Sequence, residues 1–249
     1  MITRLDQALV TRGLCPSREQ AKRAILAGKV RLNEQPAQKP SDHVRPDDVL
    51  ILETPERYVS RGGHKLEHAL KAFKLDVSGW RVLDFGAATG GFTDCLLQHG
   101  ASRVYAIDVG HGQLAWRLRH DARVELLERV NARYLTPASF SQPYEPADAA
   151  VMDCSFISLR KLFPPAIGLL APAGRIVALV KPQFEAGKHE ADRGAGVIRD
   201  AAVRERVIED LKTFVQAELP LRWLAVTESP LRGPAGNIEY FILLEKITP

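Results

Sequence analysis

The sequence of 249 residues predicts an α/β fold that follows a small α+β domain. From Trp80 onward, short apolar runs alternate with amphipathic runs, which indicates a parallel sheet covered by helices. Turn-forming residues over 53–63 interrupt the pattern and mark a domain boundary. Apolar residues make up 45% and charged residues 26%, which argues against a disordered, collagen-like or disulfide-stapled chain. We therefore expect one domain over 1–58, linker included, and a second over 59–249.

The first domain is predicted as two short helices followed by strands. Apolar residues spaced over 5–9 give a first amphipathic helix its buried face. A capping box over 17–20 opens a second helix, which Gly28 closes. Alternation over 30–32 and the apolar run 49–52 predict short strands, so this domain is a small α+β module.

The second domain contains seven runs with strand character. They are Arg81–Phe85, Arg103–Asp108, Val124–Leu127, Ala147–Asp153, Arg175–Lys181, Leu221–Thr227 and Ile238–Leu244. A helix over 201–217 precedes the last two runs, which we expect to form a hairpin. Seven strands ending in a hairpin resemble the class I (Rossmann-like) methyltransferase sheet more than a six-stranded dinucleotide-binding sheet.

The basic excess of the chain lies in its first third. Residues 1–80 hold 14 Lys and Arg against 10 Asp and Glu, whereas residues 81–249 hold 20 of each kind. Residues 1–33 alone carry seven basic and two acidic side chains. This local excess is typical of a surface that faces an anionic polymer, and it is also compatible with an ordinary solvated helix.

The same segment resembles a known RNA-binding module. Residues 4–33 follow the pattern R-L-D-x-x-L-V-x-R-G-L-x-x-S-R-x-x-A-K-x-x-I-x-x-G-x-V-x-x-N, which is similar to S4-type domains. Because A-form RNA hides its major groove, such modules read backbone shape and charge more than sequence. The candidate RNA contacts are Arg4, Arg18, Lys22, Arg23, Lys29 and, beyond this segment, Arg61.

The sequence carries no targeting, membrane or metal signal. The N-terminus lacks an apolar segment, and no run of about 18 uncharged apolar residues occurs. Cys15, Cys95 and Cys154 form no C-x-x-C pair, and no His, Asp and Glu cluster has metal-ligand spacing. We therefore expect a cytoplasmic protein without a metal, a membrane partner or an obligate protein partner.

A glycine-rich segment follows the first expected strand of the second domain. Residues 82–92 leave a strand, turn through glycines and enter a helix, a geometry that holds an anionic or polar cofactor. Ala88 stands where a dinucleotide fingerprint needs its second glycine, which disfavours NAD. The form D-x-G-x-x-x-G-G-F instead resembles the first motif of S-adenosylmethionine-binding enzymes.

Two polar residues after this segment complete a candidate cofactor site. Asp108 ends the next strand 22 residues after Gly86, where a carboxylate can accept both ribose hydroxyls of an adenosyl group. Asn131 follows the third strand, where this fold usually places an adenine contact or where a simple turn would use Asn. The candidate cofactor contacts are Asp84, Gly86, Thr89, Gly90, Gly91, Phe92, Asp108 and Asn131.

Four ionisable residues stand out by position as candidate reacting groups. Asp153 and Lys181 end neighbouring parallel strands, at the carboxyl edge where ligands bind. An antiparallel last strand would bring Glu239 to that edge, and a preceding helix would bring Lys65. Each residue alone is compatible with a surface charge, but four at one edge point to a reaction centre.

Four motifs surround these residues: S-R-G-G-H-K-L over 60–66, D-C-S-F-I-S-L over 153–159, V-K-P-Q-F-E over 180–185, and S-P-L followed by G-N-I-E-Y-F within 229–241. Together with the basic N-terminal domain they resemble the TlyA (hemolysin A) family of RNA 2'-O-methyltransferases, over about residues 2–246. The resemblance implies an FtsJ-like domain, S-adenosylmethionine as cofactor, and a catalytic tetrad. The implied tetrad is Lys65, Asp153, Lys181 and Glu239.

The resemblance also implies the substrate, cytidines of ribosomal RNA in ribosomal subunits. We expect large-subunit 23S RNA before 16S RNA, because the chain starts at the RNA-binding domain and stops soon after its last strand. A ribose hydroxyl is a poor nucleophile until a base takes its proton, and Lys181 is our candidate base. Asn131 departs from the Asp common in the wider FtsJ-like group.

Three alternative functions remain open at this point. A pore-forming hemolysin follows from the historical family label, although no membrane segment is present. A NAD-dependent reductase is opposed by Ala88. A noncatalytic ribosome-binding factor would use the first domain alone and leave the four candidate reacting groups without a task.

Overall fold

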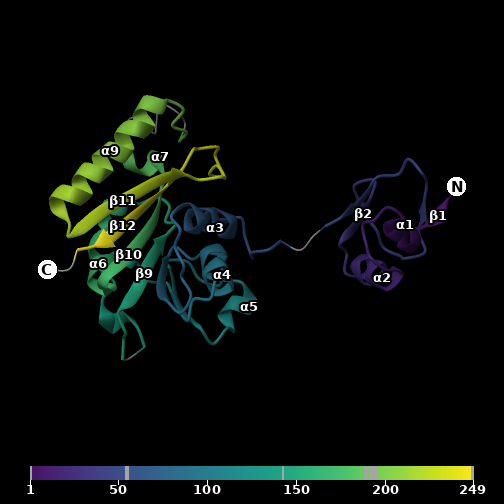
Figure 1. The fold of residues 1–249 in the computed structure, drawn as a ribbon, viewed down its shortest axis with the longest axis horizontal. Coiled ribbons are helices and arrows are strands. Elements are labelled where there is room, and N and C mark those ends of the chain that lie inside the picture. The colour runs from purple at the N-terminus through teal and green to yellow at the C-terminus, as the bar shows by residue number, and fades with distance from the viewer. Residues whose placement is uncertain (1, 54–55, 142, 188–189, 191–195, 248–249) are drawn as a thin grey trace. The chain divides into compact units, whose positions relative to one another are not determined.

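The computed structural model of the protein describes residues 2–53, 56–141, 143–187, 190 and 196–247. The chain forms two compact units, Met1–Glu56 and Arg57–Pro249 (Figure 1). Each unit has its own buried apolar core, as expected for separately packed domains. No described helix is both long and apolar enough to cross a membrane.

The first unit packs two helices against short strands. Its elements are β1 (Thr3–Arg4), α1 (Leu5–Thr11), α2 (Arg18–Leu26), β2 (Val30–Leu32), β3 (Gln35–Pro36), β4 (His43–Val44) and β5 (Leu50–Leu52). The Ser17 hydroxyl accepts a hydrogen bond from the Gln20 N–H and so caps α2, where the sequence predicted the helix to open. β2 pairs with β3 and β5, and β1 pairs with β4. The two-residue strands β1, β3 and β4 were not predicted.

The second unit is built on a seven-stranded sheet with the order β11-β12-β10-β9-β6-β7-β8. The strands are β6 (Arg81–Phe85), β7 (Arg103–Asp108), β8 (Val124–Glu128), β9 (Ala147–Met152), β10 (Leu170–Val180), β11 (Leu221–Glu228) and β12 (Tyr240–Lys246). The five strands from β10 to β8 in this order are parallel, and β12 lies antiparallel between β10 and β11. The predicted fold class, including the hairpin of the last two strands, is confirmed.

Helices cover both faces of this sheet (Figure 1). They are α3 (Gly62–Ala72), α4 (Gly91–Gln98), α5 (Trp116–Arg119), α6 (Phe163–Leu169), α7 (Pro182–Glu185) and α9 (Ala201–Glu218), with 3-10 turns η1 (Ala132–Tyr134), η2 (Pro137–Ser139) and η3 (Leu159–Lys161). Leu66 of α3 and Leu96 of α4 belong to the core on one face. Phe163 of α6 and Leu211 of α9 belong to the core on the other. A parallel sheet needs this double cover because both of its faces are apolar.

Two strands of the seven-stranded sheet start at residues other than the expected ones, whereas the strand ends differ by two residues at most. β10 begins at Leu170, five residues before the predicted start, and its pairing with β9 shifts register between Leu170 and Arg175. A left-handed backbone at Ala173 (φ 57°) accompanies this irregularity, which hides the early part of the strand from a pattern of alternating residues. β12 begins at Tyr240 rather than Ile238, so Glu239 immediately precedes the strand.

Candidate active site

The sheet topology brings the strand ends of the candidate reacting groups together. Asp153 directly follows β9 and Lys181 directly follows β10, two neighbouring parallel strands that end at the same edge. Tyr240, the first residue of β12, pairs with Val180, the last residue of β10. Glu239 therefore lies at this same edge, as the antiparallel last strand was expected to place it.

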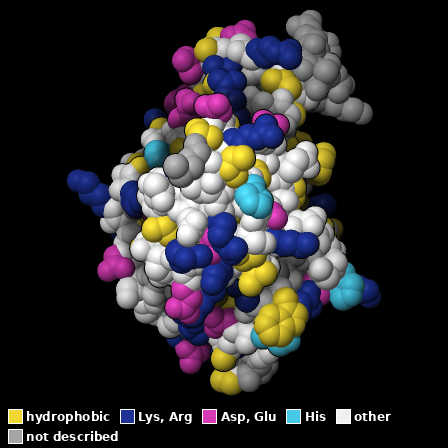
Figure 2. All heavy atoms as spheres, turned by 90° about the vertical axis from the view of Figure 1, so that its right-hand side faces the viewer, with side chains coloured by type: hydrophobic (Ala, Val, Ile, Leu, Met, Phe, Trp, Pro, Cys, Tyr) yellow, Lys and Arg dark blue, Asp and Glu magenta, His cyan; other side chains and the backbone are white. Residues whose placement is uncertain are grey.

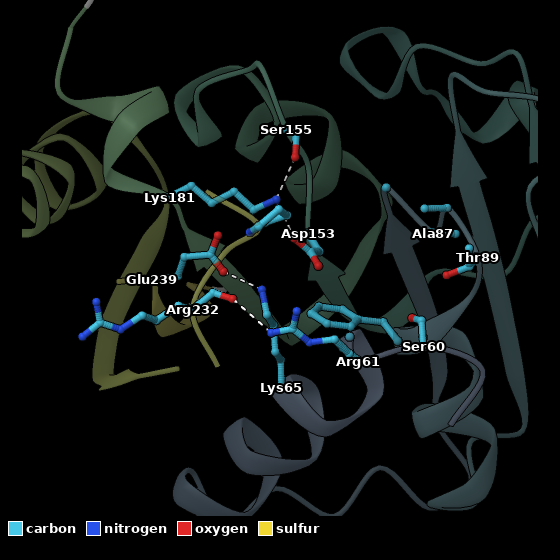
Figure 3. A pocket seen from close by; sticks show the side chains of 16 residues that line it. Ser60, Arg61, Lys65, Ala87, Thr89, Asp153, Ser155, Lys181, Arg232 and Glu239 are labelled. Atoms are coloured by element: carbon cyan, nitrogen blue, oxygen red, sulfur yellow. Dashed lines mark hydrogen bonds and ion pairs between the residues drawn. The ribbon is translucent and has the colours of Figure 1, made fainter. Parts of the chain in front are cut away.

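Lys181 is held by two neighbours from the loop that follows β9. Its Nζ atom lies 2.7 Å from Asp153 Oδ1 and donates a hydrogen bond of 2.9 Å to Ser155 Oγ. The residue is only 8% exposed, so this amine is largely withdrawn from solvent. In Figure 3 its side chain reaches across the pocket toward Ser155 and Asp153.

Lys65 and Glu239 form a second, more deeply buried pair. Lys65 lies on α3, and its Nζ atom donates to Glu239 Oε2 at 2.5 Å. The side chains are 10% and 1% exposed. Gly233 packs against the other carboxylate oxygen, because a Cβ atom there would come within 2.5 Å of Glu239 Oε1. The local packing thus leaves Glu239 little freedom to turn away from Lys65.

All four residues line one cavity of about 420 Å³. Figure 3 shows the two Lys and two carboxylate side chains converging on this space from α3, from the ends of β9 and β10 and from the start of β12. Arg61 and Arg232 also line it, and the Arg61 guanidinium donates to the Arg232 carbonyl oxygen. The structure therefore brings the predicted tetrad together.

A second cavity of about 370 Å³ adjoins the first. Gly86, Ala88, Asp153 and Ser155 line both spaces. The remaining walls of the second cavity come from the ends of β7 and β8 and from the loop after β9: Ile107, Asp108, Val109, Gln113, Val130, Asn131, Ala132, Cys154, Phe156, Ile157 and Leu162. Its position beside the glycine-rich turn fits an elongated ligand that spans both cavities.

Asp108 and Asn131 both face this second cavity, but each already has a local partner. The two carboxylate oxygens of Asp108 accept hydrogen bonds from the Gly110 and Ala88 N–H groups, at 2.7 and 2.9 Å. A carboxylate has about four acceptor positions, so capacity for further donors remains. Asn131 Oδ1 accepts from the Arg133 N–H and caps η1. Asn131 is therefore a turn-forming residue that also lines the cavity.

The glycine-rich segment adopts the expected strand, turn and helix. Gly86 has φ 86°, and a Cβ atom there would come within 2.9 Å of the Asp153 carbonyl oxygen. A Cβ atom at Gly91, the first residue of α4, would meet Ser60 Oγ at 2.3 Å. Thr89, Gly91 and Phe92 line the first cavity, whereas Gly90 packs against leucine side chains of the segment 114–118.

Asp84 lies beneath the glycine-rich turn rather than on a cavity wall. It is fully buried, and its Oδ2 atom accepts a hydrogen bond of 2.7 Å from Thr93 Oγ1. Its Oδ1 atom has no hydrogen-bond partner among the described residues. Burial, with added repulsion from Asp153 and Asp108, raises the pKa of Asp84 to about 7. Asp84 thus supports the turn from below.

The surroundings of Cys154 make its thiol unreactive. Burial, chiefly, raises the pKa of the Cys154 thiol to about 12, and the Asp153 charge adds to the shift. The thiol therefore stays protonated and is a poor nucleophile. Within the described ranges, no group of three or more His, Cys, Asp or Glu side chains could hold a metal ion.

The candidate RNA contacts of the first unit differ in how they are paired. Arg4 and Arg18 both contact the buried carboxylate of Asp6, at 3.1 and 2.9 Å. Burial alone would raise the pKa of Asp6, but the hydrogen bonds from the two arginines lower it overall. Arg23 pairs with a neighbouring glutamate on α2. These three arginines thus serve the domain's own charge balance.

Two of the candidate RNA contacts remain open to solvent. Lys22 and Lys29 are exposed, and the described part of the chain offers neither of them an ion-pair partner. On the face shown in Figure 2, Lys and Arg side chains lie interspersed with Asp and Glu side chains and do not form one continuous basic patch. Unpaired lysines are therefore the clearest carriers of positive charge in this unit.

Sequence patterns did not single out Ser155 or Arg232. Ser155 lies within the motif over 153–159, and Arg232 lies between the S-P-L and G-N-I-E-Y-F segments. The contact between Ser155 and Lys181 joins residues 26 positions apart and depends on the pairing of β9 with β10. No local signal in the sequence shows it.

Comparison with known proteins assigns the family. An S4 domain matches residues 3–50, and an FtsJ-like methyltransferase domain matches residues 58–246. The chain is 47% identical over 247 residues to the Mycobacterium tuberculosis protein named 16S/23S rRNA (cytidine-2'-O)-methyltransferase TlyA, with 98% of this chain and 90% of that protein covered. The chain belongs to the FtsJ-like methyltransferases, in the TlyA family.

Two further relatives are informative. A Campylobacter jejuni protein named 23S rRNA (cytidine-2'-O)-methyltransferase TlyA is 31% identical, with 82% of this chain and 79% of that protein covered. A solved Streptococcus thermophilus structure that carries a hemolysin name is 42% identical, with a TM-score of 0.74, and the match covers 99% of this chain and 89% of that one. Membership in this methyltransferase family agrees with the resemblance found in the sequence.

Proposed function

We propose that the protein transfers a methyl group from S-adenosylmethionine to the 2'-oxygen of a cytidine ribose in ribosomal RNA. The observation that carries this proposal is the convergence of two Lys-carboxylate pairs, Lys181 with Asp153 and Lys65 with Glu239, on one cavity. A ribose hydroxyl needs a base within hydrogen-bond reach, and a shielded amine at a cavity wall meets that need. Two TlyA relatives are named for a cytidine 2'-oxygen, which supports the choice of substrate.

Lys181 is the proposed general base. In its neutral form the amine offers one lone pair, and it takes the proton of the ribose hydroxyl while the O–H electron pair stays on oxygen. Asp153 accepts one hydrogen of the amine and fixes its direction. Lys65 lines the same cavity and can donate a hydrogen bond to ribose oxygens. Glu239 holds Lys65 for that task.

The two adjoining cavities suit an S-adenosylmethionine molecule that extends past the glycine-rich turn. When bound there, S-adenosylmethionine supplies an electrophilic methyl group on a positively charged sulfur. Its methionine part would lie in the first cavity, which Gly86 and Gly91 border, and Asp108 would accept its ribose hydroxyls in the second. Asn131 borders the same cavity and is the proposed adenine contact. Support for the cofactor also comes from the family to which the chain belongs.

The RNA substrate is proposed to reach both units. The first unit would contact the phosphate backbone through Lys22 and Lys29, with the half-exposed Arg4 and Arg18 adding to the field. Arg61 borders the reaction cavity and would contact a phosphate near the target ribose. We propose 23S RNA of the large subunit as the main substrate, because it is the RNA that both TlyA names share. Because the proposed substrate is ribosomal RNA, we propose that the protein acts in the cytoplasm.

Methyl transfer to isolated ribosomal subunits tests this proposal. Unmodified large and small subunits would be incubated separately with the protein and S-adenosylmethionine carrying a tritiated methyl group. The modified nucleoside would then be identified by mass spectrometry. The proposal expects 2'-O-methylcytidine from the large subunit, and a label on another position, or none on either subunit, would overturn it.

A further inference from the structure

The amine of Lys181 has a defined set of neighbours. A lysine nitrogen is tetrahedral, so besides its bond to Cε it has three positions for hydrogens or a lone pair. Asp153 Oδ1 and Ser155 Oγ occupy two of them, at 2.7 and 2.9 Å. The structure's described residues provide no third partner, and Lys181 lines the larger cavity. The remaining position is therefore the one available to a ligand in that cavity.

The loop that carries Ser155 is fastened to the segment that carries Lys181. Glu185, four residues after Lys181, accepts hydrogen bonds of 2.7 Å from the Ser158 hydroxyl and the Leu159 N–H. The ring centroids of Phe156 and Phe184 lie 5.1 Å apart, so these two side chains also join the loop to the segment. Phe156 has φ 62°, a left-handed conformation that a non-glycine residue keeps only where surrounding contacts enforce it. The Ser155 hydroxyl is thus set in place relative to the amine.

We infer that Ser155 is a positioning residue that aims the lone pair of Lys181 at the ribose hydroxyl. A neutral amine has two N–H bonds and one lone pair. When the N–H bonds point at Asp153 and Ser155, the lone pair occupies the third position and faces the cavity. The hydroxyl proton then passes to Nζ, and the oxygen keeps the electron pair of the broken O–H bond. This inference rests on the proposed function and adds a residue outside the four ionisable ones.

Without Ser155 the amine would have only one fixed N–H bond. Rotation about the bond between Cε and Nζ would then exchange the second hydrogen with the lone pair, so that part of the population would present a hydrogen to the substrate. The contact with Asp153 would remain, and the charge around the amine would be unchanged. A loss of orientation differs from a loss of basicity, because raising the pH cannot repair it.

Substitution of Ser155 tests the inference. Ser155→Ala removes the acceptor, and Ser155→Thr keeps a hydroxyl at an exposed position where an added methyl group finds room. The matched control is Ser102→Ala, which removes an exposed serine hydroxyl that donates to the Gly79 carbonyl oxygen and lines neither cavity. The measurements are kcat and KM for RNA and cofactor from pH 6.5 to 9.5, and the affinity for S-adenosylhomocysteine by calorimetry.

We expect kcat of Ser155→Ala to fall about tenfold at every pH, with KM values and S-adenosylhomocysteine affinity within about twofold of the unaltered protein. Ser155→Thr should recover most of the rate, and Ser102→Ala should keep kcat within about threefold. An unchanged kcat in Ser155→Ala, a loss that disappears at high pH, or no rescue by Thr would overturn the inference. Absence of ribose methylation by the unaltered protein would instead overturn the proposed function, and the inference with it.

Discussion

The buried pair of Lys65 and Glu239 allows stability and catalysis to be separated by substitution. Lys65→Met keeps an unbranched side chain of similar length but leaves the Glu239 carboxylate, 1% exposed, without its cation. Breaking one side of a buried ion pair costs about 3 to 5 kcal/mol, since the remaining charge stays desolvated. For a domain of about 190 residues, 3 kcal/mol lowers the melting temperature by about 6 to 12 °C.

The double variant Lys65→Met, Glu239→Leu removes both charges at once. Replacing both partners of a buried pair by apolar side chains is often neutral, so we expect most of the lost stability to return. Methyl transfer should stay abolished, because the proposed ribose contacts are gone. The control is Lys71→Met on the same helix, whose side chain is 70% exposed and pairs with Glu67. Glu67 keeps Arg57 as a second partner, and the exposed Lys71 contributes about 0 to 1 kcal/mol, so this variant should melt near the unaltered protein.

Thermal denaturation followed by circular dichroism, with methyl transfer measured on the same preparations, provides the assay. A single Lys65→Met variant that melts within 1 °C of the unaltered protein would refute the buried, paired state of these two groups. A double variant that regained methyl transfer along with stability would refute their role in the reaction.

Three further predictions follow from individual contacts. Asp84, with a pKa raised to about 7 by burial, binds its proton in the folded state but not in the unfolded chain, so stability falls as pH rises from about 4 to 7. In urea denaturation, Asp84→Asn should make the free energy of unfolding depend less on pH over this range. An unchanged pH dependence would contradict the raised pKa of Asp84. Charge reversal at Lys22 and Lys29 should weaken RNA binding and reduce by about two the slope of log binding constant against log salt concentration. A slope equal to that of the unaltered protein would show that these lysines only face solvent. Gly233→Ala should displace Glu239 and reduce methyl transfer at least tenfold in the tritium assay. The control Gly168→Ala, whose added Cβ meets no atom within 4 Å, should leave the rate unchanged. Equal rates for the two variants would show that the close contact of Gly233 with Glu239 does not matter for the reaction.

The sequence was most informative where chemistry and backbone geometry coincide. The glycine-rich turn was predictable because glycines at fixed spacing between a strand and a helix have few other uses. Asp153 and Lys181 could be placed at one edge because parallel strands end together. Glu239 required one more assumption, an antiparallel last strand, which the pairing of Tyr240 with Val180 confirms.

Features that depend on contacts between elements distant in the chain could not be predicted from the sequence. Arg18 looked like a free phosphate contact on a helix face, but the fold places the buried carboxylate of Asp6 beside it. For that reason our charge-reversal prediction uses Lys22 and Lys29 and leaves Arg18 in place. The contact of Ser155 with Lys181 and the early start of β10 at Leu170 likewise arise from strand pairing, which leaves no periodic signal along the chain.

In the proposed mechanism, Lys181 takes the ribose proton and does not hold the cofactor. The most direct measurement compares Lys181→Ala with the unaltered protein in single-turnover methyl transfer at saturating RNA and S-adenosylmethionine, with S-adenosylhomocysteine affinity measured by calorimetry. We predict a loss of about 10³-fold in the rate of 2'-O-methylcytidine formation, with affinity for S-adenosylhomocysteine within about twofold of the unaltered protein. Retained methyl transfer, or an equal loss of cofactor affinity, would contradict the role of Lys181 as the base.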